Sequence, residues 1–485
     1  MNARQRWTLI LASVASLMTT LDILVVTTAL NTIRLHLHAS VTELDWTVNA
    51  YTLTVAVLLL TAATVGDRLG RRRVLVTGLA LFAASSAACA LAPSIGVLIG
   101  ARAVQGIGTA MVLPQALSLV AAAFPAETRG RAMGIFAGIT GLATLSGPVI
   151  GGAVVQGLAW QWIFWLNVPI GIALVPLLRR HVAESFGPRV PVDVAGLALS
   201  GAGVLALVWG LVRGNAAGWG SPQVYGPLAA GAVLFAVFAG WERRARSPMA
   251  PVSLLVNKPF VAANASGFLM TGAMFGAVVF LAQYLQAALG EGPFVAGARM
   301  LPLTATLFLV APLAGRLVGR VGERPIVVAG LLAQATGFGW MALGSDGPYL
   351  VLVPGMLLAG AGISAALPAT QNAAVGAVPR EALGVASGIY NAMRQLGGTF
   401  GVAIGSVMFT GFGGFASSAA VARGFRAALA TAAAIAAAGA LAGLGLRARR
   451  AAGDGSPPPA GSEPSVTPSG LSAAAPRTCS GGGGC

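Results

Sequence analysis

Two charged residues lie inside long apolar stretches of this sequence, where a charge is costly. Asp22 falls in an apolar run over residues 8–33, and Arg102 falls in another over residues 96–121. A charged side chain at the centre of a bilayer is so costly that it usually faces a cavity and is functional. Because burial disfavours the charged form of a carboxyl group, Asp22 is a candidate proton carrier. The alternative is a structural aspartate that caps backbone or pairs with a polar neighbour.

Other charges in the apolar runs are few. Asp22 is the only carboxylate well inside a predicted run, and Asp193 sits at the end of one. Arg102 is the matching cation, although it could instead pair with groups at the membrane surface or extend toward water. Arg394 is a further cation, which contacts either an anionic substrate or only Asn391 and backbone carbonyls. The partner of each arginine stays open at this stage.

A compact charged loop separates two of the apolar runs. Residues 66–73 read Gly-Asp-Arg-Leu-Gly-Arg-Arg-Arg and follow an uncharged stretch over residues 46–65. Such a cluster has to lie in water while the runs beside it lie in lipid, so it predicts a tight loop at a membrane face. Asp67 at a helix end can accept from a facing helix N-terminus and pair with an arginine, which would hold one conformation.

The composition excludes a soluble enzyme. Hydrophobic residues make up 56% of the 485 residues, and only 9% are charged, whereas the surface of a soluble protein of this length needs far more charge. The sequence also has no Gly-rich phosphate loop that ends in lysine, so direct coupling to ATP is not encoded. We therefore expect no cofactor other than a proton gradient and no metal site.

The apolar runs predict an all-α polytopic membrane protein with 14 transmembrane helices. Barrel strands are excluded because they are about 10 residues long and alternate between apolar and polar residues, whereas these runs are longer and continuous. The runs cover residues 8–33, 47–66, 74–92, 96–121, 132–156, 162–178, 193–212, 225–241, 260–285, 297–318, 325–344, 349–370, 383–410 and 427–446.

The basic residues predict the orientation of these helices. If the N-terminus is cytoplasmic, nearly all arginines collect on the cytoplasmic side, as the positive-inside rule requires. The opposite loops then hold only Arg34, Arg213, Arg423 and Arg426, with Arg299 near a boundary. We therefore expect a multi-pass protein of the cell (plasma) membrane with both termini in the cytoplasm. The net charge of +16 is explained by this topology and by anionic lipid, not by nucleic acid.

An internal repeat predicts the arrangement of the helices. Residues 316–325 are a degraded copy of the 66–73 loop, with Gly319 in the place of Asp67. The two copies lie eight runs apart, which predicts two six-helix bundles with two additional helices between them, an arrangement typical of transporters. The expected parts are an N-terminal six-helix bundle (1–192), two inserted linker helices (193–246), a C-terminal six-helix bundle (247–450) and a disordered cytoplasmic tail (451–485).

Five short motifs occur in order along the apolar runs. They are Leu21–Leu30, Gly66–Arg72, Arg102–Gly108, Gly147–Gly152 and Trp160–Gly171. Together they resemble the major facilitator superfamily, specifically its fourteen-span drug:proton antiporter branch, over nearly all of residues 7–446. The first motif departs from the usual pattern at Thr28 and at the nearby Asn31.

The resemblance implies roles for the residues of these motifs. Asp22 and Arg102 would form the proton-coupling site. The loop would act as a cytoplasmic gate and conformational switch through Gly66, Asp67, Arg68, Gly70, Arg71 and Arg72. The antiporter motif would be Gly147, Pro148, Gly151 and Gly152, in which glycines allow close helix packing and the proline bends the helix. Generic small-residue packing is the alternative for this last motif.

The function implied is a proton-coupled antiporter that exports amphipathic or lipophilic small molecules by alternating access. Its cargo could be a drug or an antibiotic made by the host itself. The candidate substrate-binding residues are Trp46, Tyr51, Gln115, Phe275, Gln283, Tyr284, Asn391 and Arg394. The expected partners are the small-molecule substrate, protons and the lipid bilayer, and the expected state is a monomer. The alternatives are an exporter of lipid, siderophore or another metabolite, a solute importer, and a non-transporting membrane receptor.

Overall fold

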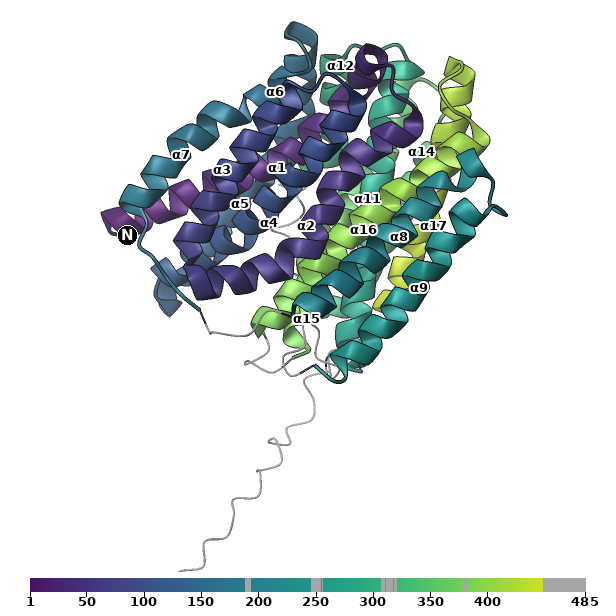
Figure 1. Cartoon of the computed structure of the whole chain (residues 1–485). Helices are drawn as coiled ribbons and strands as arrows, with labels where there is room; N and C mark the ends of the chain where they lie inside the picture. The colour runs from purple at the N-terminus through teal and green to yellow at the C-terminus, as the bar shows by residue number, and fades with distance from the viewer. Residues whose placement is uncertain are drawn as a thin grey trace, which may run out of the picture. The chain divides into compact units, whose positions relative to one another are not determined.

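The computed structural model describes residues 1–187, 193–245, 256–306, 321–378 and 383–447, together with Leu254, Val310 and Leu317. Within these residues the regular elements are helices, without a strand (Figure 1). The prediction of an all-helical chain is therefore confirmed for this part. The predicted tail over 451–485 and most of the second loop copy at 316–325 lie outside the described residues.

Nine helices make up the first half of the described chain. They are α1 (Ala3–Leu37), α2 (Val41–Leu69), α3 (Arg71–Ala90), α4 (Ile95–Ala123), α5 (Ala126–Gly157), α6 (Trp162–Trp165), α7 (Asn167–His181), α8 (Val194–Ala217) and α9 (Pro222–Glu242). The later helices are α11 (Lys258–Ala287), α12 (Pro293–Arg299), α14 (Glu323–Leu343), α15 (Tyr349–Gly376), α16 (Leu383–Phe412) and α17 (Ser418–Gly443).

The helices are long enough to cross a membrane. Among the described residues, 10 helices are long and apolar enough to span a bilayer, and the bent helix α2 would make up to 11. Each predicted apolar run overlaps at least one described helix, although the run at 297–318 is described only in part. The count of 14 spans therefore stays a prediction.

The start of helix α2 corrects the prediction. The helix begins at Val41, not at residue 47, because Ser40 and Glu43 form a capping box. The backbone N–H of Ser40 donates to the Glu43 carboxylate (2.8 Å), and the backbone N–H of Glu43 donates to Ser40 Oγ (3.3 Å). Such reciprocal bonds satisfy donors that a helix start leaves free. As a result Asp45, which precedes the predicted apolar run, lies inside the helix.

Large apolar side chains cover the outside of the helices. Ile172 of α7 is 66% exposed and Leu350 of α15 is 74% exposed, and Val233 and Leu441 are comparably exposed on α9 and α17. In water such a surface would promote aggregation. In lipid it is the expected exterior of a helical membrane protein, since backbone polar groups are satisfied within each helix.

The two ends of the helix assembly differ in charge. We call the end that holds Arg71, Arg72 and Arg179 the basic face. Helix α1 begins at this face, where the Trp7 ring stacks on His181 at the end of α7 with 4.5 Å between ring centroids. We call the other end, which includes Ser40 at the start of α2, the far face.

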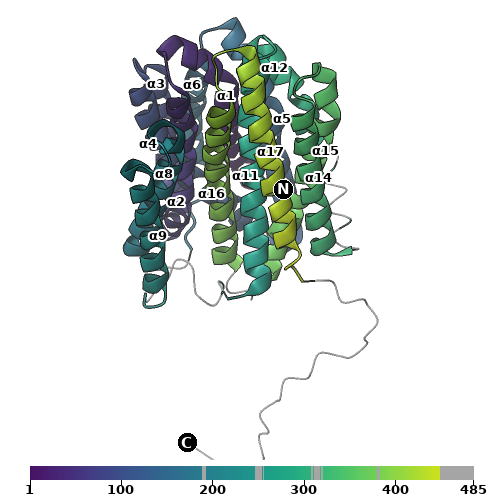
Figure 2. The same cartoon turned by 90° about the vertical axis from the view of Figure 1, so that its right-hand side faces the viewer.

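The helices form one compact unit over Met1–Ala448. Helices α1 to α7 pack mainly on one another, and helices α11 and α14 to α17 do the same, with α17 against α11, α14 and α16 (Figure 2). Helix α8 contacts both α2 and α16, and it also packs against α9 (Figure 1). The α2–α16 contact joins the two groups of helices, so α8 covers this junction. The predicted division into two six-helix bundles with two inserted helices stays a prediction.

Candidate functional site

Asp22 and Arg102 form a buried ion pair between α1 and α4. Asp22 is 3% exposed and Arg102 is 1% exposed, and the Arg102 Nη1 donates to Asp22 Oδ2. Two charges this far from water stabilise the protein only if their remaining hydrogen-bonding groups are also satisfied. The structure thus selects the pairing of Arg102 with Asp22 over the alternatives of surface pairing or extension toward water.

The second oxygen of Asp22 accepts from two amides. Gln105 Nε2 donates to Asp22 Oδ1 (3.1 Å), and Asn167 Nδ2 donates to the same atom (2.9 Å). Gln105 Nε2 also donates to Ser86 Oγ (2.7 Å). Both oxygens of the carboxylate therefore accept hydrogen bonds. Helices α1, α3, α4 and α7 each contribute one or more of these groups.

Arg102 has partners other than Asp22. Its Nη1 donates to Gln105 Oε1 (2.7 Å) and its Nε donates to the carbonyl oxygen of Thr47 (3.2 Å). Its guanidinium carbon lies 4.1 Å from the ring centroid of Tyr51 and 5.8 Å from that of Phe164. A cation held against aromatic faces gains further stabilisation when water is excluded. Arg102 would thus remain held by hydrogen bonds and rings if Asp22 were neutralised.

Tyr51 belongs to this site and not to an open substrate surface. Its side chain is 0% exposed. Its hydroxyl lies 2.7 Å from Thr109 Oγ1 and donates to the carbonyl oxygen of Thr19 (3.1 Å). The structure therefore places this predicted substrate residue in the wall of the Asp22–Arg102 pair, with its hydroxyl already bonded.

The 66–73 loop is held by two carboxylates. Asp67 Oδ1 accepts from Arg71 Nε (2.7 Å), as predicted for an arginine neighbour. The carboxylate that binds a helix N-terminus is Glu184 instead: its Oε1 accepts from the backbone N–H of Arg72 (2.8 Å) in the first turn of α3. Gly70, which precedes α3, has φ of +108° and no side chain to act as a cap. Glu184 supplies that cap from the segment after α7.

Other residues of the 66–73 loop pack closely or form hydrogen bonds with neighbouring segments. A Cβ on Gly66 would lie 2.2 Å from the side chain of Gln115, which donates to the carbonyl oxygen of Ala62 (2.8 Å). Arg72 Nη1 donates to the carbonyl oxygen of Val182 (3.0 Å). Arg68 is exposed. In the described part of the chain, Asp67 forms no hydrogen bond or ion pair with a helix of the other group. Its role as a gate latch therefore stays a prediction.

Removal of the Glu184 carboxylate is expected to loosen the first turn of α3. Loss of an N-cap typically costs about 1 kcal/mol, so in Glu184→Ala the amide of Arg72 should exchange with deuterium about fivefold faster. Glu323→Ala is the matched control, because Glu323 lies in the first turn of α14 without a side-chain cap bond. Equal exchange at Arg72 in both variants would show that Glu184 does not cap α3.

The glycines of the antiporter motif bring α5 into contact with α1. A Cβ on Gly147 would lie 2.6 Å from the Cβ of Leu24, and a Cβ on Gly151 would lie 2.4 Å from Thr28 Oγ1. Neither position has room for a side chain unless α1 shifts. Since Leu24 and Thr28 lie two and six residues after Asp22, these glycines fix the segment of α1 that carries the ion pair.

The same motif seals α5 against α12, the short helix that follows α11 along the chain. A Cβ on Gly152 would lie 2.2 Å from the carbonyl oxygen of Pro293, and one on Gly297 would lie 2.0 Å from the carbonyl oxygen of Pro148. Backbone therefore meets backbone here. Gln156 Oε1 also accepts from the backbone N–H of Phe294, at 3.1 Å.

The remaining substrate candidates do not gather at one place. Trp46 packs on Trp209 of α8 (5.5 Å between ring centroids), so it lies on the α8 side of α2. Tyr284 stacks on Phe425 and donates to the carbonyl oxygen of Ser345 (2.7 Å). These two side chains are therefore structural in this conformation.

Four other candidates are divided between different contacts. Asn391 donates to the carbonyl oxygen of Ser387 in its own helix (2.9 Å). Gln283 is buried and its Oε1 has no partner among the described residues, and the same holds for Nε of Arg394. Phe275 is partly buried and packs against two separate clusters of buried apolar side chains. The identity of the substrate-binding residues stays a prediction.

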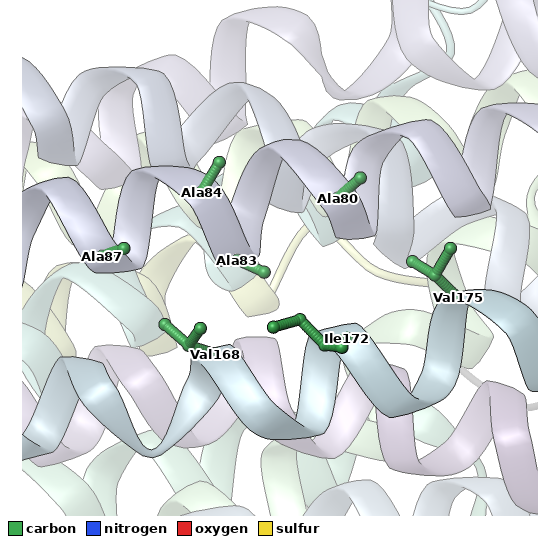
Figure 3. Close-up of a pocket in the computed structure, with 8 residues that line it drawn as sticks. Ala80, Ala83, Ala84, Ala87, Val168, Ile172 and Val175 are labelled. Carbon is green, nitrogen blue, oxygen red and sulfur yellow. The ribbon is translucent and has the colours of Figure 1, made fainter.

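An apolar groove lies between α3 and α7. Its volume is about 410 Å³, and it is lined by Ala80, Ala83, Ala84, Ala87, Val168, Gly171, Ile172 and Val175. Figure 3 shows the side chains of the two helices on either side of this groove. The lining offers no charged or hydrogen-bonding side chain and does not include Asp22, so the groove suits an acyl chain and not the proton chemistry of the ion pair.

Several residues of the site escaped the sequence analysis. Ser86 and Thr47 carried no signal, because a serine or a backbone carbonyl in an apolar run is ordinary. Asn167 lay in a motif that had been recognised, Trp160–Gly171, but no role was given to it. A buried amide in a lipid-facing helix needs a partner, and this requirement could have suggested its contact with Asp22.

The chain resembles known transporters in sequence. The sequence pattern of the Major Facilitator Superfamily matches residues 11–401 and 260–478. The Tetracenomycin C resistance and export protein of Streptomyces glaucescens is 35% identical over 404 residues, 83% of this chain and 75% of that protein. Multidrug resistance protein Stp of Mycobacterium tuberculosis is 38% identical, over 84% of this chain and 76% of that protein. Puromycin resistance protein pur8 of Streptomyces alboniger is 34% identical, over 84% of this chain and 82% of that protein.

Solved structures share the fold at low sequence identity. A POT family transporter in complex with thioalcohol conjugated peptide has a TM-score of 0.68 at 14% identity, over 90% of this chain and 94% of that chain. A bacterial homolog to human lysosomal transporter Spinster has a TM-score of 0.64 at 16% identity, over 92% of this chain and 98% of that chain. Both likenesses concern the fold alone.

Proposed function

Because this chain belongs to the Major Facilitator Superfamily, we propose that it is a proton-coupled antiporter that exports amphipathic or lipophilic small molecules by alternating access. The chain is a multi-pass membrane protein and a transporter, not an enzyme. Its relatives include antibiotic and multidrug resistance proteins. We assign the cargo to the same broad class, with an antibiotic made by the host as one candidate.

The observation that carries the proposal is the buried pair of Asp22 and Arg102. In this conformation both oxygens of Asp22 accept hydrogen bonds, and one of them pairs with the guanidinium. Protonation of Asp22 would break its ion pair with Arg102, while Gln105, Thr47 and two aromatic rings would still hold Arg102 in place. Proton binding is thereby tied to a rearrangement of α1 relative to α4, which is what coupling requires.

The direction of transport follows from the proposed topology. We place the basic face in the cytoplasm of the cell, with both termini, because positively charged loops stay on that side. The chain would then belong to the fourteen-span branch, with two helices inserted between two six-helix bundles. Protons would reach Asp22 from the far face and leave at the basic face, while cargo moves the other way. No cofactor is needed, and a monomer suffices.

Proton movement driven by cargo tests this function. The purified protein in proteoliposomes, loaded with a pH-sensitive dye, is given tetracenomycin C, puromycin or ethidium under an imposed proton gradient. We expect at least one compound to accelerate proton flux across the membrane and to be concentrated against its own gradient, and we expect an uncoupler to abolish both effects. Cargo accumulation that persists after the proton gradient is collapsed would contradict proton coupling.

A further inference from the structure

A second carboxylate is buried between the two groups of helices. Asp45 in the first turns of α2 is 3% exposed, and Ser406 Oγ of α16 donates to its Oδ2. In the described part of the chain Asp45 takes part in no ion pair, unlike Asp22. The contact lies near the far face, because α2 begins there. Asp45 is thus a carboxylate whose surroundings supply a hydroxyl but no positive charge.

Charged groups on the neighbouring helices are engaged elsewhere. Arg34 of α1 lies 4.3 Å from the ring centroid of Phe415, and Arg213 of α8 lies 4.7 Å from that of Trp209. Arg102 of α4 pairs with Asp22. Of the remaining ionisable side chains, His36 is on α1, Glu43 is on α2 and Arg394 is on α16. None of these three forms an ion pair with Asp45 among the described residues.

Asp45 is the end of a polar stripe along this junction. Asp45, Asn49 and Thr52 are spaced four and three residues apart, which places them on one face of α2. Thr399 Oγ1 of α16 donates to Thr52 Oγ1 (2.9 Å), and Thr399 lies seven residues before Ser406. The helices are therefore antiparallel and in register over two turns. We call these five residues the polar seam.

One residue of the polar seam has a side chain without partners. Asn49 is 0% exposed, and neither its Nδ2 nor its Oδ1 has a partner among the described residues. The flank of the seam is apolar, formed by Leu53, Val204, Val208 and Ala403. Buried polar groups without partners disfavour the closed state, because water would satisfy them. Opening of this junction to water would thus satisfy Asn49, whereas the backbone contact between α5 and α12 contains no such group.

We propose that Asp45 is a second proton-binding residue, separate from Asp22, whose protonation closes the polar seam at the far face. With the seam closed, the carboxyl faces Ser406 and apolar side chains, so the neutral form is favoured. With the seam open, water solvates the carboxylate and the proton is released. By linkage, a lower pH at the far face favours the closed seam and a higher pH favours the open one.

The polar seam at the far face would then open and close with the protonation of Asp45, independently of Asp22. Arrival of a proton at Asp45 would close the junction behind a proton that has already reached Asp22. The step moves one proton between water and the carboxyl oxygen of Asp45 and requires no other reactant. It requires movement of α2 against α16 but not any particular cargo.

The distance across the seam tests the proposal. Spin labels at Thr42 of α2 and Phe412 of α16 report its opening in the purified full-length protein, after replacement of Cys479 and Cys485 by serine; Cys89 is buried. In the wild type we expect the open population to grow with pH, by at most about tenfold per pH unit for a single proton. Asp45→Asn, which keeps a hydrogen-bond acceptor but no titratable group, should stay closed at every pH.

Two further variants make the result specific. Glu43→Gln removes a half-buried carboxylate one half-turn away and should keep the pH response of the wild type. Ser406→Ala keeps the titratable group and should keep a pH response, with a smaller closed population at low pH. A pH response in Asp45→Asn equal to that of the wild type, or a distance that never changes with pH, would overturn the proposal. Normal seam movement without cargo-driven proton flux would instead contradict only the proposed function.

Discussion

Replacement of Asp22 by asparagine is expected to abolish proton-driven efflux and to destabilise the fold. Asparagine cannot carry a proton, so cargo movement should lose its response to the proton gradient. It also leaves Arg102 buried without a counter-charge, and breaking a buried ion pair in this way costs about 3–5 kcal/mol. Drug resistance and uncoupler-sensitive efflux in a pump-deficient host measure the first effect, and thermal unfolding in detergent measures the second.

A double variant separates the two effects. Asp22→Asn combined with Arg102→Gln removes both charges and should regain much of the lost thermal stability, because no buried charge is left unpaired. It should not regain efflux. The matched control is Asp346→Asn, which breaks the ion pair with Arg426 at a carboxylate that is 73% exposed. Such a surface pair contributes about 0–1 kcal/mol, so the control should unfold and transport like the wild type. Efflux by the double variant would place proton coupling elsewhere.

A methyl group at Gly152 is expected to make the transporter leak protons. Its Cβ would lie 2.2 Å from the carbonyl oxygen of Pro293, and that backbone atom cannot move without α12. Overpacking of a tight contact costs about 1–3 kcal/mol, which would reduce the closed population of this junction about 5- to 150-fold. Passive proton entry into proteoliposomes without cargo should rise accordingly in Gly152→Ala.

The control for this prediction lies on the same helix. Gly138 of α5 has open space at its Cβ position, so Gly138→Ala makes the same chemical change without a clash. Its proton leak should match that of the wild type. If proton leak through Gly152→Ala is as low as through Gly138→Ala, the contact between α5 and α12 does not limit the leak. The motif would then serve generic packing.

Sequence patterns predicted the components of the site better than its contacts. The position of Asp22 and Arg102 in apolar runs was sufficient to single them out, because charge is rare in such runs. Arg102 was named as the cation that matches Asp22, and the structure shows their ion pair. The bonds from Gln105 and Asn167 did not follow from the pattern, because they depend on how α1, α4 and α7 pack together. Glu184 was unpredictable for the same reason: it caps α3 only because the segment after α7 returns to the 66–73 loop.

The burial of Asp45 could have been predicted from the sequence but was not. Its burial follows from the start of α2 at Val41, and Ser40 and Glu43 carry the serine and glutamate spacing of a capping box in the printed sequence. A helix start placed by that signal would have brought the carboxylate into the span. Its partner Ser406 would still have been missed, because contact between α2 and α16 joins residues separated by most of the chain.

The position of α8 restricts how an oily molecule can enter the transporter from the bilayer. Helix α8 lies over the junction of α2 and α16, and it covers this side with Val204 and Val208. Lipid and anything dissolved in it are thereby kept away from the polar seam. A lipophilic cargo that approaches from the bilayer is therefore kept from entering at the α2–α16 junction. Helix α8 thus closes one lateral route from the bilayer into the helix assembly.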